Sequence, residues 1–268
     1  MSKLKIAIIG LGASGAFAAR AAYDMGNDVE IYATQNGKMS PGATWLHWLP
    51  EDMSQQVAPA NIYVIGKGTG SSYSRLQWGQ VFPSSFPKEP VWEKGYDPEV
   101  VLAKLVPSSC NVNFVPFPLS DADIRDLSTG FDLVFQTFPT RESKEQQPAL
   151  VPFVAAAQFG NANPDVNYVV YNGTGKGIVV REAQLFGNKF LEFPKNMTLE
   201  EVYGLHPVET GWQYTVLKDI HPNTKPWSHS DPKIKLVGRF AEWDRRVLSH
   251  DAYARVQTII QEAEREQA

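Results

Sequence analysis

The feature that most constrains this chain is a glycine-rich turn between a short apolar strand and a helix near its start. Residues 4–9 are a nearly continuous apolar run, typical of a strand buried on both faces in a parallel sheet. The motif G-x-G-x-x-G follows at once, at residues 10–15, and an alanine-rich helix pattern extends to residue 25. Residues 29–32 are a second apolar run. This order of elements is the context in which the glycine motif predicts a dinucleotide site.

The spacing of the glycines has a chemical reason. Gly10 allows a tight turn, Gly12 lets a pyrophosphate approach the backbone, and Gly15 lets the helix pack closely on the strand. The first turn of the helix, with Ala13 and Ser14, presents free N–H groups and a partial positive charge. We therefore expect these five residues to hold the phosphates of a dinucleotide.

One position departs from the usual dinucleotide pattern. The acidic residue that binds the adenosine ribose should end the second strand, where this chain has Ala33 followed by Thr34. Glu30 lies three residues too early, and the strand period of two does not direct it to the ligand. We expect Thr34 or Gln35 to make the ribose contact; the alternative is a more weakly held cofactor.

Composition and charge narrow the class of protein. The chain has 268 residues, 43% of them apolar and 20% charged, which is ordinary for a folded soluble protein. Cys110 is its only cysteine, which predicts no internal disulfide and a reducing compartment. No signal peptide pattern and no run of about 18 apolar residues is found. We expect a cytoplasmic protein without membrane contact, in the host cytoplasm if the source is a virus.

Charge and metal-binding patterns give weaker signals. A net charge of −4 argues against broad binding to nucleic acid, yet residues 218–246 carry seven Lys/Arg against four Asp/Glu. The usual meaning of such a segment is a solvated face; the alternative is a DNA-contacting surface. No two histidines have metal-ligand spacing and no Cys/His cluster exists, so we expect no metal site.

After the first strand–turn–helix–strand, the sequence predicts a loop and, further along, a set of strands. Residues 35–48 are rich in Gly, Pro and aromatic residues, and a loop after the second strand lies beside the ligand in a doubly wound sheet. Its tryptophans either border a flat ring or anchor the loop in the core. Runs at residues 167–171, 177–182 and 189–193, separated by Asn-Gly and Gly-Asn turns, predict an antiparallel sheet.

Two further segments carry a family resemblance. Residues 131–139 read Phe-Asp-Leu-Val-Phe-Gln-Thr-Phe-Pro, and residues 234–243 read Ile-Lys-Leu-Val-Gly-Arg-Phe-Ala-Glu-Trp before a final helix that starts near residue 249. With the glycine motif, these segments resemble the FAD-binding fold of the glutathione-reductase superfamily. The amine oxidase and UDP-galactopyranose mutase branches are the most similar, and the compact size resembles phage-encoded flavoenzymes.

The resemblance implies an α/β fold, in which a Rossmann-like FAD-binding domain carries an inserted antiparallel β-sheet substrate domain. We expect residues 1–60, 100–140 and 230–268 to form the FAD-binding domain and residues 61–99 and 141–229 the substrate or cap domain. Beyond the glycine motif and Thr34, the implied cofactor contacts are Gly42, Ala43, Thr44, Trp45, Gly238, Arg239, Trp243, Ser249, Asp251 and Ala252. Ser249 and Asp251 have a second interpretation as helix caps.

The leading functional interpretation is an FAD-dependent oxidoreductase that oxidises or cleaves the C–N bond of an amine or amino-acid-like substrate. The candidate catalytic residues are His47, Arg181, Tyr214 and His250. Arg181 resembles the arginine that mutase-like enzymes place near the flavin, but it could equally pair with Glu182 or Glu192.

Three other functions stay open. One is a non-redox sugar isomerase similar to UDP-galactopyranose mutase. Another is a flavin-dependent lyase or oxidase acting on amino-acid-modified thymine in phage DNA, with residues 218–246 facing the DNA. The last is a binding protein with a vestigial cofactor site. The partner is thus a small amine or a modified nucleotide, and the oligomeric state is undetermined.

Overall fold

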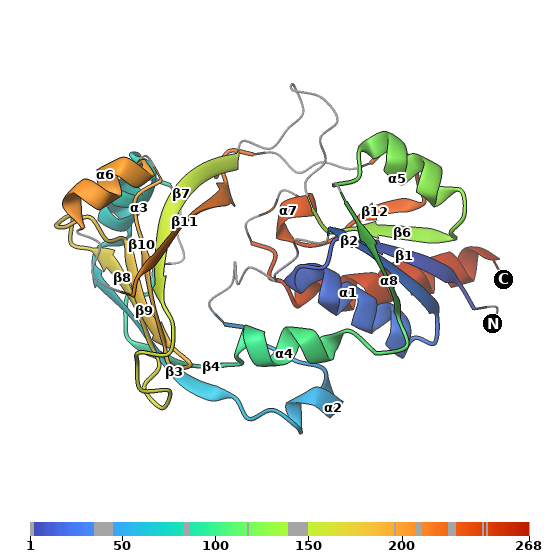
Figure 1. Cartoon of the computed structure of the whole chain (residues 1–268), viewed down its shortest axis with the longest axis horizontal. Helices are drawn as coiled ribbons and strands as arrows, with labels where there is room; N and C mark the ends of the chain where they lie inside the picture. The colour runs from blue at the N-terminus through green and yellow to red at the C-terminus, as the bar shows by residue number, and fades with distance from the viewer. Residues whose placement is uncertain are drawn as a thin grey trace. The chain divides into compact units, whose positions relative to one another are not determined.

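A computed structural model describes residues 3–34, 45–82, 86–116, 118–138, 150–195, 197–206, 211–224, 229–242, 244 and 246–267. The chain divides into two compact units (Figure 1). The first unit comprises Met1–Ala43, Pro98–Ala149 and Ile220–Ala268, and the second comprises Thr44–Asp97 and Leu150–Asp219. Residues 44–60, which we expected in the cofactor domain, group with the second unit, because Trp45 packs with Ile62 in its core.

The first unit contains a five-stranded parallel sheet with the order β12-β6-β1-β2-β5. Numbered along the chain within this unit, its strands have the order 3-2-1-4-5 when read from the β5 edge. The winding direction reverses between β1 and β6, and ligands of doubly wound sheets bind at such a switch point. The predicted Rossmann-like fold is confirmed. The strands are β1 (Lys5–Ile9), β2 (Asp28–Thr34), β5 (Asn111–Val115), β6 (Leu133–Gln136) and β12 (Ile234–Leu236).

Helices cover both faces of this sheet (Figure 1). On one face, Ile124 of α5 packs in a buried cluster with Ala7, Ile9 and Val134. On the other, α1 buries a run of alanines around Phe17, and these small side chains let the helix lie close to its neighbours. The helices are α1 (Ala13–Asp24), α4 (Pro98–Leu105), α5 (Asp121–Ser128), α7 (Arg239–Glu242) and α8 (Asp251–Gln267).

The second unit contains a seven-stranded sheet with the order β11-β7-β10-β9-β8-β3-β4. The strands β7, β10, β9 and β8 pair antiparallel, as expected, but β3 and β8 are parallel, so the sheet is mixed. The strand expected at 177–182 begins later, at Arg181. The strands are β3 (Ala60–Gly68), β4 (Val91–Gly95), β7 (Leu150–Gln158), β8 (Tyr168–Gly173), β9 (Arg181–Leu185), β10 (Asn188–Glu192) and β11 (Gln213–Ile220).

Among the described residues, α3 packs on one face of this mixed sheet and α6 on the other. The short helix α2 (Glu51–Ser54) belongs to the same unit. Tyr73 of α3 (Gly70–Trp78) lies 5.5 Å from the Tyr171 ring, which packs on a cluster formed by Trp45, Ile62, Val64, Val169, Ala183 and Leu185. We call this side the α3 face. Val202 of α6 (Leu199–Leu205) packs on Val154, Ala156, Leu191 and Phe193, on what we call the α6 face. Side chains alternate between the two faces along each strand.

Helix length and hydropathy also bear on the membrane question. Within the described ranges, no helix combines the length and apolar character that crossing a bilayer requires.

Candidate functional site

The glycine turn lies at the carboxyl end of β1, beside the switch point of the parallel sheet. Gly10 has a φ of +100°, and a Cβ atom there would lie 2.6 Å from Thr137 Oγ1. A Cβ atom on Gly15 would lie 2.0 Å from the carbonyl oxygen of Gly10. Around Gly12, by contrast, no atom of the described residues, apart from its chain neighbours, lies within 4 Å of the Cβ position. Gly10 and Gly15 are therefore required by packing, while Gly12 borders open space.

Thr137 ties this turn to the neighbouring strand. Its backbone N–H and its hydroxyl both donate to the Ile9 carbonyl, each at 3.0 Å. The N–H of Gly10 donates to the Tyr32 carbonyl at 2.8 Å, which joins the turn to β2. The threonine of the 131–139 segment was not among the predicted site residues. Its signal in the sequence was the Thr-x-Pro that closes an apolar strand.

The N-terminus of α1 has no cap of its own. Its N-cap residue is Gly12, which makes no side-chain capping hydrogen bond, and its first turn carries no acidic residue. The helices α3, α5 and α6 are instead capped by Thr69, Ser120 and Thr198, whose side chains accept from N–H groups of the first turn. The first N–H groups of α1 therefore remain available to an anionic ligand, and the helix dipole favours one.

The C-terminal glycine of the resemblance meets the first turn of α1. Gly238 has a φ of +95°, and a Cβ atom there would lie 2.5 Å from the Cβ of Ser14. The N–H of Gly238 donates to Oε1 of Glu242 at 2.9 Å, and Arg255 lies 3.4 Å from Oε2. Burial raises the pKa of Glu242, opposed by these two partners. Glu242 is a site residue that motif reasoning missed.

The remaining predicted cofactor residues of the first unit have local structural roles. The Arg239 Nε–H donates to the Val247 carbonyl at 3.2 Å. Asp251 Oδ2 accepts from the Leu248 N–H at 2.7 Å, which fits the capping interpretation. Ala252 is buried in α8, and Ser249 is half-buried just before it. Gly42, Ala43, Thr44, Gln35 and Trp243 lie outside the described residues.

His250 precedes α8 and packs edge-on against Phe17 of α1, with ring centroids 6.5 Å apart. Its Nε2 lies 3.7 Å from Oδ1 of Asp251. Burial lowers the pKa of His250, and the Asp251 charge partly opposes this shift. The neutral imidazole is therefore favoured in the folded protein.

The end of β2 lacks the acidic residue that usually binds the adenosine ribose, as the sequence indicates. Ala33 is buried, and Thr34 ends the strand opposite Val115 of β5. Glu30 is engaged by its neighbours instead, since Tyr32 donates to it at 3.0 Å and Lys5 lies 3.3 Å away. Burial and Glu30 together raise the pKa of Tyr32 to about 12. The contact of Thr34 with the ribose stays a prediction.

In the second unit, Trp45 is a core residue, 7% exposed among the side chains of the α3 face. A Cβ atom on Gly95 would lie 2.7 Å from its ring, so the tryptophan occupies a closely fitted space. Its Nε1–H points to Nδ1 of His47 at 3.2 Å, and His47 lies 3.5 Å from Glu93. The geometry favours the anchoring role for Trp45, with His47 held beside it.

Arg181 lies on the α3 face, directly across from Tyr171 on one side and Glu192 on the other. It forms an ion pair with Glu192, and its guanidinium lies 5.9 Å from the Tyr171 ring centroid. Burial alone would lower the pKa of Arg181, but the charge of Glu192 together with Tyr171 and Tyr73 raises it overall. Of the two predicted partners, Glu192 is the one used. Glu182 instead accepts from the Tyr168 hydroxyl at 2.9 Å.

Tyr214 belongs to the other face of the sheet. Its ring packs on the α6-face cluster, and its hydroxyl lies 2.8 Å from Nδ1 of His206. Because alternate residues of a strand point to opposite faces, Tyr214 and Arg181 do not share one pocket within this unit. The structure thus assigns the two predicted catalytic residues of this unit to different faces, and their catalytic roles stay predictions.

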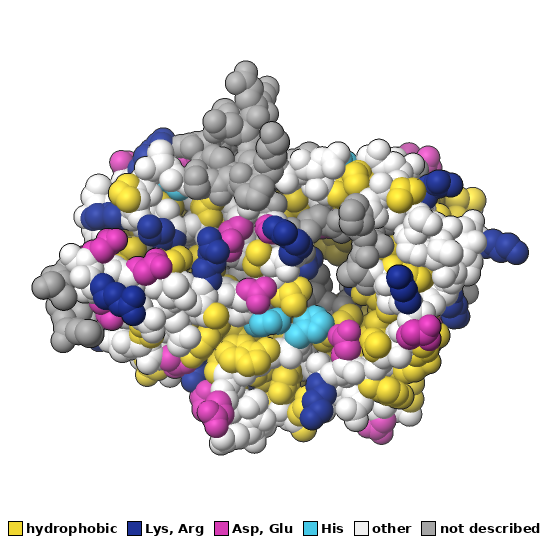
Figure 2. Space-filling model, turned by 180° about the vertical axis from the view of Figure 1, so that it is seen from behind, with side chains coloured by type: hydrophobic (Ala, Val, Ile, Leu, Met, Phe, Trp, Pro, Cys, Tyr) yellow, Lys and Arg dark blue, Asp and Glu magenta, His cyan; other side chains and the backbone are white. Residues whose placement is uncertain are grey.

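Where the basic segment 218–246 is described, some of its basic side chains are engaged within the protein. Lys233 donates to the Phe131 carbonyl at 3.1 Å, and Arg246 pairs with Asp244. On the face of the molecule in Figure 2, Lys/Arg and Asp/Glu side chains are interspersed without a large field of one sign. Contact of residues 218–246 with DNA stays a prediction. No cluster of three or more His, Cys, Asp or Glu suited to a metal ion occurs in the described ranges.

Comparison with known proteins identifies the fold. No protein-family model matches the sequence, and no curated protein matches it significantly. Iminodiacetate oxidase from Chelativorans sp. BNC1 superposes with a TM-score of 0.53 at 10% identity, over 96% of this chain and 95% of that one. A geranylgeranyl bacteriochlorophyll reductase-like protein from Thermoplasma acidophilum gives 0.53 at 14% identity, over 99% and 79%.

A tryptophan 5-halogenase gives a TM-score of 0.55 at 12% identity, over 97% of this chain but only 66% of the halogenase. The chain thus spans just under two thirds of that enzyme. At such identities the likeness shows a shared fold.

Proposed function

We propose that this protein is an FAD-dependent oxidoreductase. The observation that carries the proposal is the uncapped N-terminus of α1 behind the Gly12 opening, at the switch point of the sheet. The C-terminal Gly238 turn is packed against Ser14 in the same first turn. An NAD-binding Rossmann domain accounts for the glycine loop alone, whereas the FAD motifs account for the glycine loop, the 131–139 strand and the 234–243 segment together.

The structural relatives support this class of chemistry. The solved proteins that share the fold include an oxidase, a reductase-like protein and a halogenase. When bound, FAD would supply the hydride-accepting ring. The chain would contribute the N–H groups of Ala13 and Ser14 toward the pyrophosphate and the Thr34 hydroxyl toward the ribose.

The substrate we propose is an amine or amino-acid-like molecule whose C–N bond is oxidised or cleaved. A neutral amine carbon can release hydride without a strong general base, so the protein must mainly position the substrate and exclude water. In the second unit, Arg181 presents a guanidinium that Glu192 holds in a fixed position on the α3 face. Such a group can orient a carboxylate of the substrate.

The first experiment is an absorption spectrum of the purified protein, followed by anaerobic addition of candidate amines. Bands at about 375 and 450 nm that bleach with an amine are the expected result. Bands that bleach only with dithionite would shift the proposal to non-redox, mutase-like chemistry. Absence of flavin bands after incubation with FAD would overturn the cofactor assignment.

A single variant tests whether the glycine turn itself binds the flavin. Gly12→Ala adds a methyl group where the protein itself has 4 Å of open space, so its folding stability should fall by no more than about 1 kcal/mol. Its FAD affinity, measured by quenching of flavin fluorescence, should fall at least about tenfold, because the methyl group enters the space of the pyrophosphate.

A further inference from the structure

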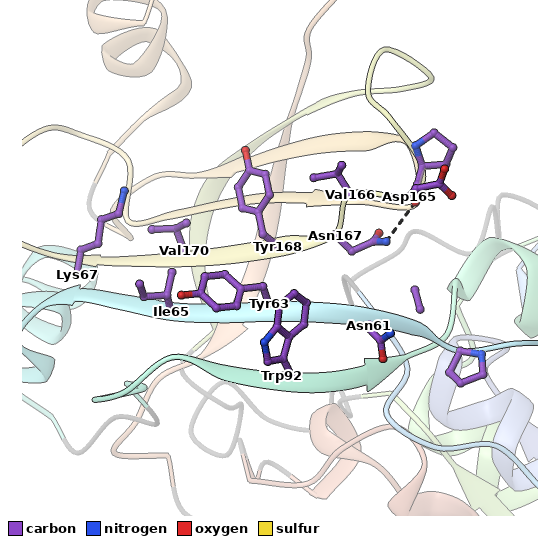
Figure 3. Close-up of a pocket in the computed structure, with 13 residues that line it drawn as sticks. Asn61, Tyr63, Ile65, Lys67, Trp92, Asp165, Val166, Asn167, Tyr168 and Val170 are labelled. Carbon is purple, nitrogen blue, oxygen red and sulfur yellow. Dashed lines mark hydrogen bonds between the residues drawn. The ribbon is translucent and has the colours of Figure 1, made fainter.

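An open groove of about 1010 Å³ lies on the α6 face of the second unit (Figure 3). Its floor is formed by β3 and β8, and β4, the edge strand of the sheet, forms one side. Residues 164–167 form its rim at one end, and Lys67 lies at the other. Its volume is at the upper end of the roughly 300–1,000 Å³ typical of ligand pockets. Because it is open, a chain-like ligand can extend beyond it.

Three aromatic side chains form a row across the middle of the groove. Tyr63 of β3 is directly opposite Trp92 of β4 on one side and Tyr168 of β8 on the other. The rings of Tyr63 and Trp92 lie 5.1 Å apart at an angle of 54°. Trp92 is 70% exposed, which is unusual for so large an apolar side chain. The row is a ready surface for stacking.

Hydrogen bonds hold this surface in place. The Tyr168 hydroxyl donates to Oε1 of Glu182 at 2.9 Å, which fixes the orientation of its ring. At the rim, the Asn167 amide donates to the Pro164 carbonyl at 3.1 Å and accepts from the Phe186 N–H at 2.7 Å. These bonds preorganise Tyr168 and the rim, so a ligand would not have to order these two parts of the groove.

The polar groups at the ends of the groove are not engaged in this way. The side chains of Asn61, Lys67 and Asp165 make no hydrogen bond or ion pair with any other described residue. One ammonium and one carboxylate leave the lining without net charge. A nucleic acid strand needs cations along its phosphates, so this charge balance disfavours it. A neutral ligand rich in hydroxyl groups matches both the charge and the free donors and acceptors.

We propose that this groove binds a neutral saccharide chain. The C–H groups on the flat face of a sugar ring carry partial positive charge and pack on the electron-rich faces of Trp92, Tyr63 and Tyr168. The hydroxyl groups at the sugar edges bond to Asn61, Lys67 and Asp165. The residues that line the groove all belong to the second unit, and the inference does not rest on the proposed function.

The test is calorimetric titration of the full-length protein with cellohexaose, maltohexaose and chitohexaose, and with single-stranded (dT)20 at two salt concentrations. At least one hexasaccharide should bind, and Trp92→Ala should weaken that binding at least about tenfold. Trp92→Phe should retain most of it. Phe159→Ala is the matched control, since Phe159 is also exposed, at 43%, in the same unit but outside the groove.

Three results would overturn the proposal. One is a Trp92→Ala protein that binds the saccharide as tightly as the wild type. Another is no hexasaccharide binding at about 10 mM, a concentration that detects even very weak affinity. The third is salt-sensitive binding of (dT)20 that needs Trp92, with the saccharides inert. Circular dichroism and FAD uptake should be the same in all variants, because Trp92 is a surface residue of the second unit.

Discussion

Gly238 and Glu242 close a reciprocal hydrogen-bonded turn. The Gly238 N–H donates to the Glu242 carboxylate at 2.9 Å, and the Glu242 N–H donates to the Gly238 carbonyl, also at 2.9 Å. The turn fixes the conformation of the glycine that packs on Ser14 at the start of α1. Glu242 thus supports, through Gly238 and Ser14, the surface where we propose that the pyrophosphate binds.

We predict that Glu242→Ala weakens FAD binding by leaving the Gly238 N–H without its acceptor. The buried, unsatisfied N–H should cost about 1–3 kcal/mol of folding free energy. Glu242→Gln keeps an acceptor oxygen and should cost less than about 1 kcal/mol, because the lost ion pair is with a half-exposed Arg255. Urea unfolding and flavin-fluorescence titration measure the two effects. Equal losses in both variants would contradict this role.

Gly15→Ala should destabilise the protein itself, unlike Gly12→Ala. Its methyl carbon would lie 2.0 Å from the Gly10 carbonyl oxygen, so either the helix or the turn must move. We expect a loss of about 2 kcal/mol or more in the absence of FAD, measured by chemical denaturation. If the two alanine variants unfold at the same urea concentration, the distinction between a packing glycine and a ligand-facing glycine fails.

Arg181 and Glu192 should behave as one unit. Replacing either residue leaves a buried charge without its partner, so Arg181→Met and Glu192→Gln should each cost about 3–5 kcal/mol. The double variant should be considerably more stable than the sum of the single losses predicts. A double-mutant cycle by urea denaturation measures this coupling. Additive losses would show that the pair is not energetically linked.

Stability should depend on pH through His250. Because burial lowers its pKa, the unfolded chain takes up a proton below the ordinary value of 6.5 while the folded protein resists it. The free energy of unfolding should therefore fall as the pH drops below 6.5, by at most about 1.4 kcal/mol per pH unit from this group. His250→Gln should flatten this dependence between pH 5 and 7. An unchanged slope in the variant would assign the effect to another group.

Local signals explain what the sequence predicts well. The strand, turn and helix at the start of the chain agree with the structure within a residue or two, because they have their own pattern of apolar residues and breakers. The contrast between Gly12 and the capping Thr69, Ser120 and Thr198 was also present in the sequence. This contrast can be recognised only once the first residue of each helix is known from the structure.

The missed elements depend on distant partners. The strand β4, Val-Trp-Glu-Lys-Gly, follows a proline-rich stretch and is defined by pairing with β3. The helix α3 begins Gly-Ser-Ser, a poor helix sequence, and is held by Tyr73 against Tyr171. The parallel pairing of β3 with β8 joins segments about a hundred residues apart, which no local pattern reports. Tertiary packing determines these elements.

The division of each unit among separate stretches of chain has a consequence for synthesis. Ile6 of β1 pairs in register with Leu133 of β6. The other neighbour of β6, β12, is synthesised only about a hundred residues later, near residue 234. In the second unit, β3 stays without its parallel neighbour until β8 has been made. A ribosome working at about 5–20 residues per second therefore exposes unpaired strand edges for several seconds before either core can close. Contacts of such long range predict slow folding. We expect the nascent chain to need protection from aggregation until its last strands have been synthesised.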